Sequence, residues 1–178
     1  MSSNLSGLVE RLNDRRSAFV ETLDALPAGA RGSKPSPEAW SPDEIAEHVF
    51  RSERAVLRGL ARQLDPEGER RDLGKPSSVR FAGLIAALHS PKKFKVPAGA
   101  SASAPAGMTY DEIREGWLGF PAQWNAIIGS IPQELEGVGL IRHPISGPMT
   151  LSQSLQFLAV HAARHFKQLE RTLNALGR

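Results

Sequence analysis

Three histidines in two separate stretches of the chain are the residues best suited to chemistry: His48, His161 and His165. The last two are four positions apart, which on an α-helix is a rotation of about 40° and a rise of ~6 Å, so both rings project from one face. Each of the three lies on or beside the apolar stripe of a predicted helix, so all three rings are expected to point inward. Neutral imidazole binds divalent transition metals. The pattern therefore predicts one divalent metal ion held by these three side chains, with zinc or nickel expected.

A metal-free reading of the same residues stays open at this point. A single inward histidine is more often a hydrogen-bonded core residue than a ligand. Three inward rings would need three sets of hydrogen-bond partners in an apolar interior, and each unsatisfied group costs about 1–3 kcal/mol. A shared cation removes that cost, and the metal site is therefore the leading interpretation.

Other polar residues near the histidines in sequence have two alternative roles. Glu44 stands one turn before the first histidine and Gln168 three residues after the last, so either could hydrogen-bond to a ligand ring. The alternative is that Glu44 only caps its helix and Gln168 faces solvent. Arg164 is expected at the surface rather than at a pocket rim. His89 and His143 lie near prolines in predicted loops and are not counted as ligands.

Four long amphipathic helices are expected to position the histidines, because apolar residues recur every three or four positions in four segments. Ser41 with Glu44, and Thr109 with Glu112, form capping boxes that open the second and third segments. Thr150 with Gln153 opens the fourth in the same way. No convincing alternation of period two is present. The segments are 5–26, 41–64, 109–131 and 150–177, and they predict an all-α four-helix bundle.

An insertion separates the second and third predicted helices. Residues 65–107 contain apolar positions that suggest a short additional helix, stopped by Pro91, followed by a connector rich in Pro, Ala, Gly and Ser that is expected to be mobile. The basic run Lys92, Lys93 and Lys95 in this stretch is expected to be solvated. In the third long helix, Pro121 predicts a kink or break unless packing offsets a cost of ~3 kcal/mol.

Composition limits the class of protein. The 178 residues suit a single domain, 1–178, and no apolar run approaches the ~20 residues that cross a bilayer. No secretory signal is visible, so a cytoplasmic location is expected. The chain has no cysteine, which excludes disulfides and thiolate ligands. Its 22 basic and 19 acidic residues are interspersed and give a net charge of +3, so neither nucleic acid nor membrane is an expected partner.

Two stretches of the chain resemble the DinB/YfiT-like superfamily of metal-dependent bacterial proteins. One runs from Trp40-Ser41-Pro42 to His48-Val49, and the other from His143-Pro144 through Gly147-Pro148-Met149-Thr150 to His161-Ala162-Ala163-Arg164-His165. The resemblance implies a four-helix bundle with a metal in a pocket between helices, held by His48, His161 and His165. Characterised members of that superfamily include transferases and isomerases that use low-molecular-weight thiols such as bacillithiol or mycothiol. The 65–107 insertion departs from the shortest members.

Three functions fit these observations. A site with three nitrogen ligands leaves a coordination position open, so the first is a metal-dependent enzyme that activates a low-molecular-weight thiol for S-transfer, or water for hydrolysis, on a small-molecule substrate. The second is a non-catalytic bundle that binds a metal or small ligand. The third is a metal-free interaction module that forms a homodimer. No residue is assigned as a general base.

Overall fold

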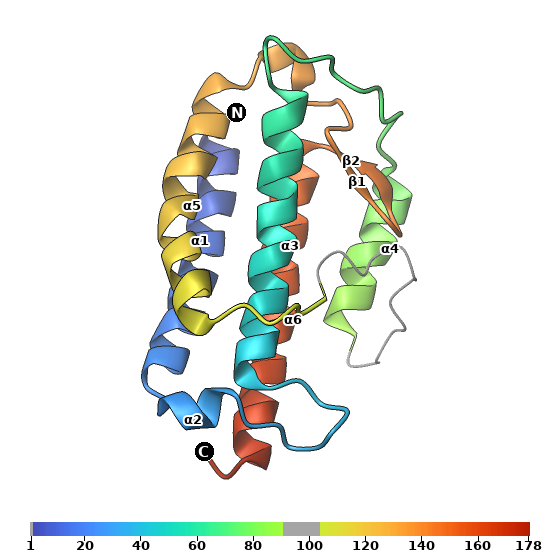
Figure 1. Cartoon of the computed structure of the whole chain (residues 1–178). Helices are drawn as coiled ribbons and strands as arrows, with labels where there is room; N and C mark the ends of the chain where they lie inside the picture. The colour runs from blue at the N-terminus through green and yellow to red at the C-terminus, as the bar shows by residue number, and fades with distance from the viewer. Residues whose placement is uncertain (1, 91–103) are drawn as a thin grey trace.

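Four long helices make up most of the structure, a computed structural model that describes residues 2–90 and 104–178. They are α1 (Ser2–Asp24), α3 (Pro42–Gln63), α5 (Tyr110–Ser130) and α6 (Leu151–Ala175). The predicted all-α four-helix bundle is confirmed (Figure 1). The shorter elements are α2 (Ala28–Arg31), α4 (Ser78–His89), the 3-10 helix η2 (Gln133–Leu135) and the strands β1 (Ile141–His143) and β2 (Gly147–Met149).

The helix order brings the two histidine-bearing helices into contact. α1 and α3 each pack against both α5 and α6. In Figure 1, α1 and α6 run in one direction, and α3 and α5 run in the other. Because α3 and α5 are parallel neighbours, the chain between them must return along the bundle, and it forms α4 against α6 on the way. The short helix expected in the insertion is therefore present.

The three predicted capping boxes define where the helices begin. In α3 the Glu44 amide donates to Ser41 Oγ over 3.2 Å, and the Ser41 amide donates to the Glu44 carboxylate over 2.9 Å. Thr109 with Glu112 and Thr150 with Gln153 make the same reciprocal pair of bonds. These bonds satisfy amides that have no partner inside the helix, which fixes the first turn.

Two features differ from the sequence prediction. Residues 141–149 form a two-stranded antiparallel hairpin, with Ile141 opposite Met149, where no strand was expected. Strands of three residues are too short to show an alternating pattern. The second difference is that α5 continues unbroken through Pro121. Its neighbours Phe120 and Trp124 are buried in the core, and this packing holds the helix across the missing amide.

Part of the predicted insertion lies outside the described residues. This applies to Pro91, to the basic run at Lys92, Lys93 and Lys95, and to the connector up to residue 103. Within the described ranges, no helix is both long and apolar enough to cross a membrane.

Candidate metal centre

The structure brings the three predicted histidines together between α3 and α6. One ring nitrogen from each of His48, His161 and His165 lies within 4.8 Å of the corresponding atoms of the other two. The Nε2 atoms of His48 and His161 are 3.1 Å apart. The ring centroids are separated by 4.5 to 4.9 Å. Three rings from sequence positions far apart therefore meet around one point.

Aromatic side chains enclose the three rings. Trp40, just before α3, lies with its ring centroid 5.0 Å from that of His48 and 6.2 Å from that of His165. On α6, Phe157 lies 5.2 Å from His161. These rings cover part of the imidazoles; His161 keeps only 8% of its surface exposed, while His48 and His165 are half-buried.

Burial keeps His161 and His165 neutral. Burial, followed by the neighbouring His165 and His48, lowers the pKa of His161 well below its usual value. Burial and then His48 lower the pKa of His165 to about 3, although the bond to Gln168 acts in the opposite direction. A neutral imidazole has a lone pair available for a metal, so these rings need not lose a proton before they bind one.

The donor set fits a divalent transition metal. Two nitrogens that each lie about 2.0–2.1 Å from a tetrahedral ion are about 3.3 Å from each other, close to the separation of the His48 and His161 Nε2 atoms. The buried Nδ1 of His161 has no hydrogen-bond partner within the described residues, so hydrogen bonding there does not explain its burial. Three imidazole rings facing one point are better matched to a shared cation than to one another.

Gln168 contacts one of the three histidine rings directly. Its Oε1 lies 2.9 Å from His165 Nδ1, so that nitrogen donates the proton and Nε2 is left with its lone pair. Glu44 has the alternative role: it caps α3 and forms an ion pair with Lys34 at 2.7 Å. Arg164, expected at the surface, instead donates to carbonyls at the C-terminal end of α4, including that of Leu88 at 2.9 Å.

The two histidines set aside in the sequence do not belong to the group of three. His89 is exposed at the end of α4. His143 lies in β1, half-buried, and its Nδ1 accepts from the amide of Ile145 at 3.2 Å. Its ring centroid is 4.7 Å from that of Phe157, which separates it from His161.

Glu47 is a residue near the site that sequence reasoning missed. Its side chain is buried, and its carboxylate accepts from the amides of Ala106, Gly107 and Met108 at 2.7, 3.1 and 3.2 Å. The carboxylate thus ties the end of the long crossover to α3, beside His48. A glutamate on the apolar side of a predicted helix was the available signal, but its partners lie about 60 residues away in sequence.

The low pKa values predict acid sensitivity of the metal-free protein. His143, with a pKa lowered by burial to about 4, joins His161 and His165 among the groups that stay neutral in the folded state. In the unfolded chain they take up protons below an ordinary value of about 6.5. The stability that these neutral histidines contribute is therefore fully present above a pH of about 6.5 and is lost as the pH falls toward their folded-state pKa values. The free energy of unfolding falls by roughly 1.4 kcal/mol per pH unit for each extra proton bound on unfolding. Chemical denaturation with a chelator present, from neutral pH to about 4, should show a shallower loss for His165→Asn than for the unsubstituted protein; equal slopes would contradict the prediction.

The protein is thus a four-helix bundle that carries an inward group of three histidines between α3 and α6. The chain belongs to the DinB superfamily, which it matches over residues 11–169. Among solved structures it is similar to TT2238, a four-helix bundle protein, with a TM-score of 0.56, 18% sequence identity, and coverage of 94% of this chain and 98% of that chain. This likeness shows the fold alone. No curated protein matches the sequence.

Proposed function

We propose that the protein is a metal-dependent enzyme in which His48, His161 and His165 hold one divalent ion, zinc or nickel, and present a small thiol to an electrophilic substrate. The observation that carries the proposal is the meeting of three imidazoles within 4.8 Å, packed against aromatic side chains. A divalent ion there would act as a Lewis acid on a group that enters its open position.

The surrounding residues favour a thiol over water as that group. Within the described ranges, the group of possible ligands contains histidines and no carboxylate. The nearest buried carboxylate in sequence, Glu47, is already occupied by three backbone amides and Arg51. Hydrolytic metal sites commonly pair the metal with a carboxylate general base. A thiol has an ordinary pKa of about 8.5 and needs less help to ionise.

The chain's own residues would bind, orient and shield the reactants. The protein has no cysteine, so the reacting sulfur must come from a low-molecular-weight thiol. That sulfur would form a bond to an electrophilic carbon of the substrate, while the thiol proton leaves with the displaced group. Trp40 and Phe157 would shield one side of the rings from water, and Gln168 would hold the His165 ring in one orientation.

Turnover tests this proposal. The full chain, loaded with zinc or with nickel, is mixed with a panel of small thiols and electrophiles, and in parallel with a panel of esters and amides. We expect thiol transfer that is absent from the variant carrying His48→Ala, His161→Ala and His165→Ala together. Hydrolysis without thiol transfer would mean that the site activates water and not a thiol. Silence in both panels, with metal still bound, would favour the non-catalytic binding protein over the enzyme.

Gln168 gives a milder prediction. Gln168→Ala removes the acceptor for His165 Nδ1, so the ring loses its fixed tautomer and orientation. Metal affinity is expected to fall roughly 10- to 100-fold, as is usual when a hydrogen-bond partner of a ligand is lost. Competition with a fluorescent zinc chelator measures the change. The matched control is Gln153→Ala, which alters the same residue type on α6 at its N-terminal cap and should leave metal affinity unchanged.

A further inference from the structure

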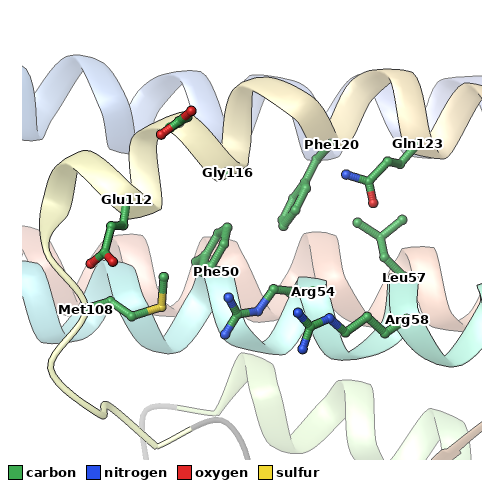
Figure 2. A pocket seen from close by; sticks show the side chains of 10 residues that line it. Phe50, Arg54, Leu57, Arg58, Met108, Glu112, Gly116, Phe120 and Gln123 are labelled. Atoms are coloured by element: carbon green, nitrogen blue, oxygen red, sulfur yellow. The ribbon is translucent and has the colours of Figure 1, made fainter.

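A groove of about 510 Å³ lies between α3 and α5. Phe50, which lines it, comes two residues after His48 and is rotated by about 200° around α3, so the groove opens on the opposite side of that helix from the three histidines. Figure 2 shows Phe50, Leu57 and Phe120 along the middle of the groove and Met108 at one end. This volume is in the range of small-molecule pockets, about 300–1,000 Å³.

The floor of the groove is aromatic and held in place. The rings of Phe50 and Phe120 stack with centroids 5.2 Å apart and an interplanar angle of 5°. A Cβ atom at Gly116 would lie 2.5 Å from the Phe50 ring, so the absence of a side chain there lets the ring rest on the α5 backbone. Met108 is fixed at the end of the groove because its amide is bound by Glu47. The groove is thus formed by packed residues.

Two arginines on the α3 rim, Arg54 and Arg58, form no ion pair within the described residues. By contrast Arg51, about one turn before Arg54 on α3, is paired with Glu47. Figure 2 shows the Arg54 and Arg58 guanidinium groups side by side along α3. The Arg54 guanidinium lies 4.8 Å from the centroid of the Phe50 ring, which fixes it against the floor.

The electrostatics at Arg54 are consistent with a bound anion. Burial, then Arg58 and Arg51, lower the pKa of Arg54, while Glu47 acts in the opposite direction, so on balance the surroundings disfavour its charge. Across the groove, Glu112 is bound by the amide and hydroxyl of Thr109, and neither it nor Glu115 forms an ion pair with the arginines. Negative charge in a ligand is therefore favoured on the α3 side only.

We propose that this groove binds a small amphiphilic carboxylate, with the carboxylate held by Arg54 and Arg58 and the apolar body lying along Phe50, Leu57 and Phe120. The planar guanidinium fork matches a carboxylate in geometry, and charge-assisted hydrogen bonds of this kind are among the stronger polar contacts. The site is separate from the histidine group, and the proposal does not depend on the function assigned there.

Paired ligands test the proposal on the full chain. Naphthoate and the uncharged naphthalenemethanol share an apolar body and differ in the carboxylate. Calorimetric titration should show saturable binding of naphthoate to one site per chain and much weaker binding of the alcohol. The double variant Arg54→Gln/Arg58→Gln should weaken naphthoate binding roughly tenfold or more, because the charged donors are lost. The double variant Arg54→Lys/Arg58→Lys keeps the charges but lacks the planar guanidinium fork, so its affinity for naphthoate should lie between those of the unsubstituted protein and the double glutamine variant.

Two further variants locate the site. Arg62→Gln removes an arginine one turn beyond Arg58 on α3 that does not line the groove, and should leave binding unchanged. His165→Ala should also leave naphthoate binding unchanged. Loss of binding in this variant would place the carboxylate at the histidine group and overturn the proposal. Equal affinity for naphthoate and the alcohol, or an unaltered affinity in the double glutamine variant with native helix content, would overturn it as well.

Discussion

Replacing His161 with alanine is expected to reduce bound zinc from about one ion per chain to nearly none, because two ligands remain where three are needed for a stable open site. The loss in affinity should exceed the roughly 10- to 100-fold effect of removing a partner of a ligand, since a direct bond to the ion disappears. His161 is also the most buried of the three rings, so the alanine variant leaves a cavity inside the bundle. Elemental analysis after dialysis against zinc measures the stoichiometry.

The matched control for this experiment is His89→Ala. His89 is an exposed histidine at the end of α4, so the protein with His89→Ala should retain its full metal content. Because His161→Ala also perturbs the core, His48→Ala, at a half-buried position, serves as a second variant, and circular dichroism verifies that both keep their helices. Full metal content in both folded variants, or none in the unsubstituted protein after loading, would contradict a three-histidine centre.

The sequence was sufficient to predict the helices and the meeting of the histidines for one physical reason. Helix periodicity and capping boxes are local, so Ser41 with Glu44 and Thr150 with Gln153 set the start of α3 and α6 correctly. Once the apolar stripe of each helix faces the core, the direction of His48 and His161 follows from their positions within the stripe. The role of Gln168 is local in the same sense, because it lies one turn from His165.

Contacts between distant segments were beyond the same reasoning. The hairpin at 141–149 depends on pairing and on packing against the bundle, and Arg164 reaches carbonyls at the end of α4 that lie more than 70 residues away. Glu47 is a similar case, since its role depends on how the crossover returns to α3. A side chain's polarity shows that it needs a partner, but it does not show where that partner is.

Arg16 is the clearest example, since it is a charged residue within the amphipathic segment 5–26 and its sequence neighbours do not show its partner. The structure buries it, with 4% of its surface exposed, in contact with the carboxylate of Glu53, which is 1% exposed. Trp124 Nε1 donates to Glu53 Oε1 over 2.7 Å, and Arg16 also donates to Asn13. Burial raises the pKa of Glu53 to about 7, although Arg16 and Trp124 act to lower it. The bundle therefore has a charged pair at its centre that links α1, α3 and α5.

Breaking this pair from one side should destabilise the fold more than any of the single substitutions at the histidines or at Gln168. Arg16→Met leaves the Glu53 carboxylate in the core without its counter-charge, and such a change typically costs about 3–5 kcal/mol. Arg16→Met combined with Glu53→Gln removes both charges but keeps an acceptor for Trp124 Nε1, so it should be more stable than Arg16→Met alone. The neighbouring Arg15, which is exposed, is the matched control, and Arg15→Met should change stability by less than about 0.5 kcal/mol.

The pH dependence distinguishes an unpaired buried carboxylate from a simple packing defect in Arg16→Met. Without Arg16 the pKa of Glu53 should rise further in the folded state, because the burial that already raises it is no longer opposed by a nearby cation. A group whose folded pKa lies above its unfolded value stabilises the fold at low pH and loses that contribution as pH rises through the folded pKa. Urea denaturation of Arg16→Met should therefore show a stability deficit, relative to the unsubstituted protein, that shrinks as pH falls from about 8 to about 5. The double variant with Glu53→Gln lacks the titrating carboxylate, so the stability of Arg16→Met relative to the double variant should increase as pH falls. A difference between these two variants that is the same at every pH would mean that the pKa of Glu53 is not raised in Arg16→Met.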